Sequence, residues 1–241
     1  MHWREEGIIL SVRRHGESSG IVEVFSRGHG RTLGLVHGAR SKSRRPVLQP
    51  GNVVDASWRA RLSEQLGTFS LEAVSLKAGL LMENPARLDA LLSSVSLIQM
   101  VPERESHPKL YDAFRFVLDV LDQDALWSTL LVRWELGLLE ELGYGLDLTG
   151  CAGGGSAAHL IYVSPRSGKA VSAEMGANYH DQLLALPSFL RGETNQQIGK
   201  REVLDGFRLT GHFLLRHILA PRGLGLPEAR LRLVSRLEDQ L

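Results

Sequence analysis

Cysteine is almost absent from this chain, in which Cys151 alone carries a thiol. A single cysteine excludes an internal disulfide and is compatible with a reducing cytoplasm. Long apolar runs are also missing, because Arg, Asp or Glu interrupts each one before it reaches the roughly 20 residues that cross a bilayer. The charged start, Met1–Glu6, does not resemble a signal peptide. We therefore expect a cytoplasmic protein with no membrane partner.

Metal-binding and catalytic spacings are scarce. The histidines form no H-E-x-x-H motif and the lone cysteine forms no C-x-x-C pair, so we expect no metal.

Residues 16–20 match the G-x-S-x-G motif of serine hydrolases, which requires a strand before Ser18 and a helix after it. Strand patterns flank the motif on both sides, which favours a β turn. We expect no catalytic residue, and a serine hydrolase is the enzyme alternative.

Acidic residues are missing from one long stretch. The thirty-one residues between Glu23 and Asp55 contain neither Asp nor Glu. Their six cations are Arg27, Arg31, Arg40, Lys42, Arg44 and Arg45. At the centre, residues 38–46 consist mainly of glycine, serine and cations, with almost nothing to bury. This pattern indicates a mobile basic loop that contacts phosphates, and a solvated charged loop is the alternative.

The net charge of +1 conceals a difference between the two parts of the chain. Residues 1–80 hold twelve Lys and Arg against seven Asp and Glu, whereas residues 81–241 hold sixteen against twenty. The basic excess therefore belongs to the first third of the chain. It predicts a polyanionic partner there and a different kind of partner for the rest.

Hydrophobic alternation with a period of two dominates the first eighty residues. The predicted strands are 7–13, 20–25, 32–36, 52–61 and 67–74. Five short strands, with a longer connection between the third and fourth, are typical of a closed barrel of the OB type, and an SH3-like barrel is the structural alternative. The alternation places Trp58 and Phe69 in the barrel core.

The hydrophobic period changes to 3.6 near Leu80. Asn84-Pro85 provides an N-cap followed by a first-turn proline, and so predicts a helix up to residue 100. The other predicted helices are 108–121, 124–142, 182–190, 200–219 and 227–241. Residues 146–180 break this pattern and suggest a small hairpin. The predicted class is multidomain α+β, with an OB-type five-stranded β barrel domain at 1–80, an α-helical bundle domain at 81–241 and an inserted hairpin at about 146–180.

The helix predicted at 200–219 has a basic face. Arg201, Arg208, His212 and Arg216 fall within about 80° of arc at 100° per residue. This face is either simply solvated or a receptor for an acidic, partly apolar peptide whose carboxylates the guanidinium groups would hold.

Several segments, in the same order along essentially the whole chain, resemble the RecO family of bacterial recombination mediators. They are Gly7–Leu10, His15–Ser19, Phe25–Gly30, Gly34–Arg40 and Leu48–Gly51, followed by Arg133–Leu139, Leu142–Tyr144, Tyr162–Ser164 and Gly168–Ala170. The resemblance implies an OB fold that binds single- and double-stranded DNA and anneals complementary strands.

The resemblance also implies partners. The helical domain would dock the acidic C-terminal tail of single-stranded-DNA-binding protein, and a complex with RecR would help to load recombinase onto gapped DNA. Such a protein would associate with the nucleoid during repair. A protein–protein adaptor that does not bind DNA is the alternative.

Many members of that family bind zinc through two C-x-x-C pairs in the insertion. Here Cys151 is the one cysteine present, Gly154 stands at the position of its partner, and Ser172 and Met175 stand at the positions of the second pair. We therefore expect no zinc and no other cofactor, and a hairpin held by packing alone.

The residues expected to contact DNA are the cations of the predicted barrel, which would follow phosphates without reading the sequence. They are Arg13, Arg14, Arg27, Arg31, Arg40, Lys42, Arg44, Arg45, Arg59 and Arg61. The residues expected to hold the acidic tail are Arg201, Arg208 and Arg216.

Overall fold

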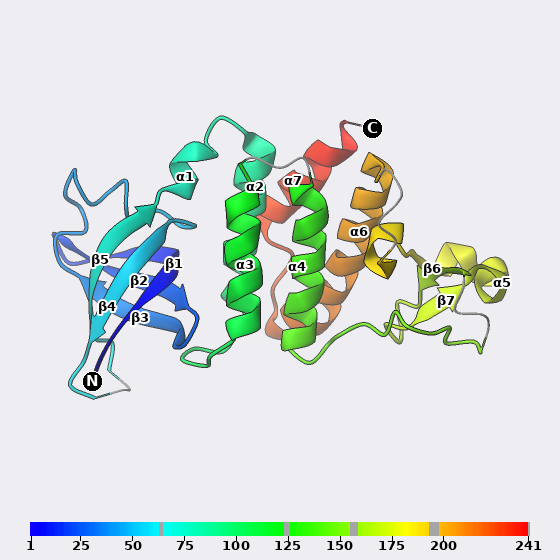
Figure 1. Ribbon diagram of the computed structural model, residues 1–241, viewed down its shortest axis with the longest axis horizontal. Coiled ribbons are helices and arrows are strands. Elements are labelled where there is room, and N and C mark those ends of the chain that lie inside the picture. The colour runs from blue at the N-terminus through cyan, green and yellow to red at the C-terminus, as the bar shows by residue number, and fades with distance from the viewer. Residues whose placement is uncertain (63–64, 123–125, 155–158, 193–197, 241) are drawn as a thin grey trace. The chain divides into compact units, whose positions relative to one another are not determined.

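A computed structural model describes residues 1–62, 65–122, 126–154, 159–192 and 198–240 (Figure 1). The chain forms two compact units, Met1–Gln123 and Asp124–Leu241. The predicted change from strands to helices near residue 80 is confirmed. The compact units divide later, so the three helices that directly follow the barrel belong to its unit. The division into domains 1–80 and 81–241 stays a prediction.

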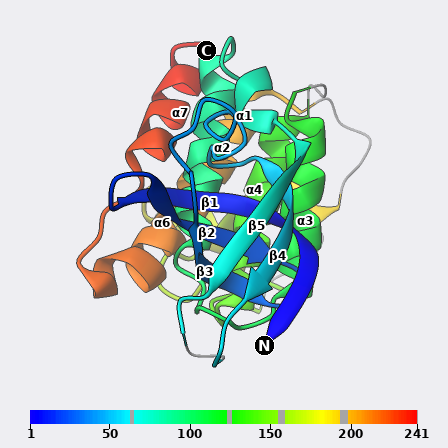
Figure 2. The ribbon, with the colours of Figure 1, turned by 90° about the vertical axis from the view of Figure 1, so that its left-hand side faces the viewer.

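The first unit contains a closed five-stranded barrel, as predicted (Figure 2). Its strands are β1 His2–His15, β2 Ser19–Ser26, β3 Gly30–Val36, β4 Val53–Arg59 and β5 Thr68–Ser75. The strand order is β1-β2-β3-β5-β4, and only the β3–β5 pairing is parallel among these strands. A bulge between Ile9 and Ser11 bends β1, which pairs with β2 and also with β4 and thereby closes the barrel.

The barrel core confirms the predicted alternation. Trp58 and Phe69 are buried, with 3% and 4% of their surface exposed. The indole Nε1 of Trp58 donates to the carbonyls of Leu33 and Leu66 at 3.1 and 3.2 Å. Gly67 lies at φ +68°, and a Cβ there would be 2.4 Å from the Trp58 ring. Glycine is therefore required where the chain enters β5.

Three helices complete the first unit: α1 Lys77–Leu80, α2 Pro85–Ile98 and α3 Pro108–Val120. The predicted cap at Asn84 is confirmed, because its side chain accepts from the backbone N–H of Arg87 at 3.2 Å. Both α2 and α3 begin with proline, whose missing N–H has no helical partner at that position in any case.

The second unit is mainly helical. Its longer helices are α4 Trp127–Glu141, α6 Lys200–Phe213 and α7 Glu228–Glu238. The inserted segment contains β6 Leu160–Val163, β7 Ala170–Ser172, α5 Ala173–Gly176 and β8 Leu184–Ala185. Antiparallel pairing of β6 with β7 confirms the predicted hairpin, to which β8 adds a third strand. The predicted starting residue of α4, Asp124, and the last residue, Leu241, lie outside the described residues.

Two helix predictions in this unit need correction. The helix predicted at 182–190 is wrong, because these residues form β8 and a 3₁₀ turn at Ser188–Arg191. Pro187 lies within the segment, lacks a backbone N–H and interrupts helical bonding. The helix predicted at 200–219 remains α-helical only to Phe213, and Leu214–Leu219 form a π-helical turn.

A buried ion pair connects the helices of the second unit. Arg230 Nε donates to Glu135 Oε1 at 2.8 Å, and both side chains are nearly inaccessible to solvent. Arg230 also donates to the carbonyl of Phe207 at 2.7 Å, and the Thr210 hydroxyl donates to Glu135. The pair thereby joins α4 and α7 to α6. Because its charges are hydrogen-bonded on several sides, their burial is compensated.

Candidate nucleic-acid interface

The basic loop between β3 and β4 is anchored to the barrel at both ends. Ala39 and Leu48 are buried in the barrel core. The buried amide of Asn52 donates to the carbonyls of Pro46 and Val47 at 2.8 and 3.0 Å. Within residues 38–46 only Ala39 is buried, which agrees with the expectation that the centre of the loop has almost nothing to bury. The backbone of the basic loop is held against the barrel, and its cations are attached to this anchored backbone.

The loop cations differ in exposure and in the hydrogen bonds that they make within the protein. Lys42 and Arg45 are exposed. Arg40 is also exposed, and its Nη1 donates to the carbonyl of Glu17 at 2.8 Å, which ties the loop to the β1–β2 turn. Arg44 is half-buried, and its Nη1 donates to the carbonyl of Leu71 on β5 at 2.8 Å. Arg44 therefore orders the loop and offers less of its charge to solvent than its neighbours do.

Three predicted DNA-contacting residues line one hollow of about 300 Å³, which we call the Arg13 hollow. Arg13 and Arg14 come from the end of β1, and Arg40 comes from the basic loop. All three are exposed, and no carboxylate pairs with any of them within the described ranges. Three guanidinium groups in one concavity concentrate positive potential, which attracts anions.

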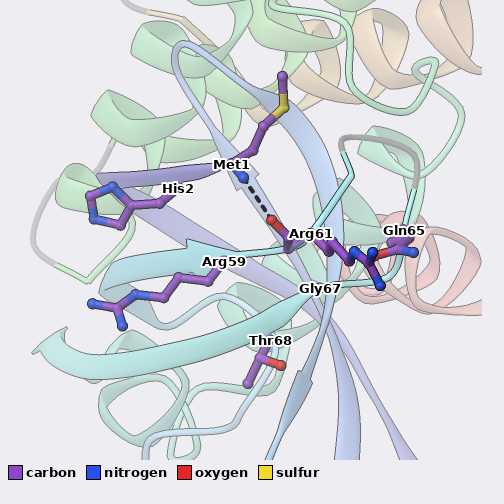
Figure 3. A pocket seen from close by; sticks show the side chains of 8 residues that line it. Met1, His2, Arg59, Arg61, Gln65, Gly67 and Thr68 are labelled. Atoms are coloured by element: carbon purple, nitrogen blue, oxygen red, sulfur yellow. Dashed lines mark hydrogen bonds between the residues drawn. The ribbon is translucent and has the colours of Figure 1, made fainter.

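A second hollow of about 600 Å³, the Arg59 hollow, lies where β1 begins and β4 ends (Figure 3). Arg59 and Arg61 line it together with His2. The N-terminal ammonium of Met1 donates to the carbonyl of Ala60 at 2.7 Å and adds another positive charge. Figure 3 shows His2 and Arg59 extending on one side of this hollow. The structure therefore groups five of the ten predicted DNA-contacting residues into two hollows of the barrel.

Arg27 lies outside both hollows. It makes a bidentate ion pair with Asp112 of α3, with N–O distances of 2.9–3.1 Å. The hydrogen bond that Arg27 donates to Asp112, followed by the negative charge of that carboxylate, raises the pKa of Arg27. Although more than half of each side chain is exposed, the neighbouring carboxylate offsets the charge that Arg27 presents to a phosphate.

Arg31 has a structural role that the sequence prediction missed. Its side chain is 12% exposed and pairs with Glu23, which is 3% exposed, at 2.5 Å. The same guanidinium donates to the carbonyls of Gln99 and Val101. Glu23 also accepts from Ser11 at 3.0 Å and from the Gln99 amide at 2.7 Å. We call this set the Glu23 network. Little of this guanidinium is exposed and its donors are engaged within the protein, which weighs against a phosphate contact, and the contact predicted at Arg31 stays a prediction.

The predicted tail-binding residues are not equivalent. Arg201 is exposed at the start of α6. Arg208 pairs with Glu238 at 2.9 Å and with Asp205 at 3.4 Å. Arg216 donates to the carbonyl of Pro165 in the inserted segment at 2.5 Å. Because Arg216 lies in the π-helical turn, the arc calculated for a uniform α-helix does not describe its position.

The G-x-S-x-G match does not form a nucleophile elbow. Ser18 lies in the turn between β1 and β2, and the segment that follows is a strand, not a helix. Its carbonyl accepts from the backbone N–H of Arg40 at 3.3 Å. The predicted β turn is confirmed, and the geometry that the hydrolase mechanism needs is not found at this serine.

The inserted segment brings three of the expected degenerate zinc positions together. The Cys151 sulfur accepts from the backbone N–H of Ser172 at 3.2 Å, and the Ser172 hydroxyl accepts from the backbone N–H of Met175 at 3.4 Å. No cluster of three or more His, Cys, Asp or Glu that could hold a metal occurs in the described part of the chain. The absence of a cofactor stays a prediction.

Within the described ranges, no helix is long and apolar enough to cross a membrane.

Comparison with known proteins adds family evidence to this geometry. The family described as "Recombination protein O N terminal" matches residues 1–76, and the family described as "Recombination protein O C terminal" matches residues 84–224. The chain belongs to the RecO family. The N-terminal match spans all five barrel strands, and the C-terminal match begins at the residue that caps α2. The predicted resemblance and the OB-type, multidomain α+β fold class are therefore confirmed.

Similar relatives align with nearly the whole chain. A protein of Methylobacterium nodulans is 50% identical over 234 residues, which cover 95% of each chain. A protein of Mesorhizobium japonicum is 47% identical over 98% of this chain and 94% of its own, and one of Rhodospirillum centenum is 50% identical over the same shares. Each is named DNA repair protein RecO. Membership in this family assigns the chain to DNA repair.

Proposed function

We propose that this RecO family protein is a non-catalytic recombination mediator. Its barrel binds single- and double-stranded DNA through phosphates and anneals complementary strands. With RecR and single-stranded-DNA-binding protein, it helps to load recombinase, and it associates with the nucleoid during repair. The observation that carries this proposal is the grouping of Arg13, Arg14, Arg40, Arg59 and Arg61 in two hollows of one barrel.

Phosphate contact explains binding without sequence preference. Guanidinium groups at the rim of a hollow reach phosphate oxygens but do not contact base edges, so they position DNA without reading it. The two hollows line opposite ends of β1, from His2 to Arg14. Lys42 and Arg45 add exposed charges on the basic loop. A strand held at both hollows would therefore follow the barrel surface, as the grooves of other OB folds guide single strands.

Annealing follows from the same charges. Two complementary strands repel each other because each carries one negative charge per nucleotide, and a basic surface that neutralises both lowers this repulsion. The protein needs no reactive side chain for this step, since base pairing supplies the driving force.

The helical unit would recruit the acidic tail of single-stranded-DNA-binding protein. Arg201 is the most available of the three candidates, because Arg208 and Arg216 already have partners. An incoming carboxylate would have to compete with Asp205 and Glu238 at Arg208. The expected site is therefore centred on the exposed start of α6.

Annealing of oligonucleotides coated with single-stranded-DNA-binding protein tests the proposal. The wild type is expected to accelerate duplex formation, and a variant with Arg40, Lys42 and Arg45 all changed to Gln is expected to lose most of this acceleration. Arg4→Gln is the matched control, because Arg4 is an exposed barrel arginine already paired with Asp55 at 2.5 Å.

Two results would contradict the proposal. If the wild type fails to accelerate annealing and fails to retain naked DNA at low salt, the protein is an adaptor that does not bind DNA. If the triple variant and the control anneal equally well, the basic loop is not the contact surface.

A further inference from the structure

A third pocket in the first unit is lined mainly by aromatic rings, with one arginine among its lining residues. It measures about 530 Å³ and lies beside the first residues of β1. Trp3, Trp58 and His29 line it, together with Met1, His2, Gly28, Thr32 and Arg104. We call it the stacking pocket. Its volume lies in the range of pockets that take small organic ring systems.

The three rings are nearly parallel. The centroids of Trp3 and His29 are 4.4 Å apart with 9° between their planes, and those of Trp3 and Trp58 are 6.0 Å apart with 18° between their planes. Trp58 is buried, Trp3 is half-buried and the His29 side chain is 44% exposed. The pocket therefore has an apolar aromatic interior and an imidazole at its mouth.

Glu5 fixes the imidazole at the mouth. One oxygen of its carboxylate lies 3.0 Å from His29 Nδ1, and the other accepts from the backbone N–H of Gly28 at 2.8 Å. Both carboxylate oxygens are therefore occupied at this turn. A ring held in place in this way loses little conformational entropy when another flat ring stacks on it.

The stacking pocket shares two lining residues with the Arg59 hollow. Met1 and His2 line both, and Arg59 and Arg61 line the hollow. At the other boundary, Arg104 donates to the carbonyl of Gln65, a residue that also lines the hollow. A pocket lined by aromatic rings and lying next to cations complements a nucleotide, which joins a flat base to a phosphate.

We infer that the stacking pocket receives one unpaired nucleobase of a bound single strand while the Arg59 hollow contacts an adjacent phosphate. This inference rests on the proposed DNA binding and adds to it a preference for single strands. In a duplex the bases are stacked and paired, so none can enter the pocket without being flipped out, which costs free energy. The faces of all four bases can stack on an aromatic ring, so the pocket would not select sequence.

The test compares two ligands of equal length and charge with the full-length protein. One is oligothymidylate and the other is an abasic phosphodiester chain, and fluorescence anisotropy at fixed low salt gives both affinities. Stacking of one base contributes about 1–3 kcal/mol, so oligothymidylate should bind about 5- to 150-fold tighter than the abasic chain. Trp3→Leu and His29→Leu should each shrink this ratio toward one while the affinity for the abasic chain stays the same. Phe116→Leu is the control, because Phe116 is an exposed aromatic residue of the same unit and does not line the pocket.

The possible outcomes distinguish a failure of the base-stacking inference from a failure of the proposed DNA binding. If the wild type binds both ligands equally, the stacking inference is wrong and phosphate binding remains. If the ratio is large but survives both pocket substitutions, bases are held elsewhere and the inference is also wrong. If neither ligand binds, DNA binding itself fails. His29→Leu alters an exposed ring, so it decides the matter if Trp3→Leu does not fold.

Discussion

Replacement of Arg31 by alanine tests whether this residue supports the fold or contacts DNA. The Arg31 guanidinium pairs with Glu23 and donates to two backbone carbonyls, and both partners of the ion pair are almost fully buried. Removal of one member of such a pair leaves a buried charge without compensation and typically costs about 3–5 kcal/mol. We expect the free energy of unfolding of the first unit to fall by about that amount.

Urea denaturation measures this loss. With m near 2 kcal/mol/M, the midpoint should shift down by about 2 M. Native-state hydrogen exchange of barrel amides reports on the first unit separately from residues 124–241. The matched variant is Arg59→Ala, an exposed cation of β4. It should keep the stability of the wild type but weaken DNA binding at low salt.

The two variants should therefore have opposite effects: Arg31→Ala lowers stability, whereas Arg59→Ala weakens DNA binding. Folded Arg31→Ala protein is expected to bind DNA with the same dependence on salt as the wild type. The structural role of Arg31 is refuted if this substitution leaves stability unchanged and removes one phosphate contact from the salt dependence.

Three other predictions follow from the same contacts. A variant with Arg13, Arg14 and Arg40 all changed to Gln removes the three guanidinium groups of the Arg13 hollow. On a single strand, the slope of log affinity against log salt should change from about −4 to about −2, because each lost phosphate contact contributes roughly 0.7. An unchanged slope would mean that the phosphates are bound elsewhere. Arg230→Ala should destabilise the second unit by about 3–5 kcal/mol in thermal or urea unfolding, because Glu135 is left buried and unpaired, and a change below about 1 kcal/mol would contradict this role. Arg201→Glu should weaken binding of an acidic tail peptide in anisotropy titrations and leave naked-DNA binding intact, whereas equal loss of both would mean that the two sites are not separate.

Sequence patterns predicted the features of the fold that depend on residues close together in the chain, such as strand alternation and helix caps. Alternation placed Trp58 and Phe69 inside the barrel, and the Asn84-Pro85 pair marked the start of α2. In the segment at 182–190, the helix prediction took no account of Pro187, which interrupts helical bonding, and the prediction failed. A proline within a short apolar run was the signal that should have decided the matter.

The candidate site was less predictable, because side-chain partners come from distant parts of the chain. Arg31 was indistinguishable from the exposed cations until the structure placed Glu23 and Gln99 beside it, the latter 68 residues further along. The stacking pocket likewise depends on strand register, which sets Trp3 opposite Trp58. One signal was present, since continuing the alternation back from Ile9 places Trp3 on the core-facing side of β1.

The most direct test of the account is a salt series for wild-type protein and a fluorescent single-stranded oligonucleotide. If about six phosphates are neutralised, the oligonucleotide is retained in dilute buffer, and log affinity falls linearly with log salt at a slope of about −4. Failure to retain the oligonucleotide even in dilute buffer, or an affinity that does not change with salt, would contradict the claim that the barrel cations bind the DNA backbone.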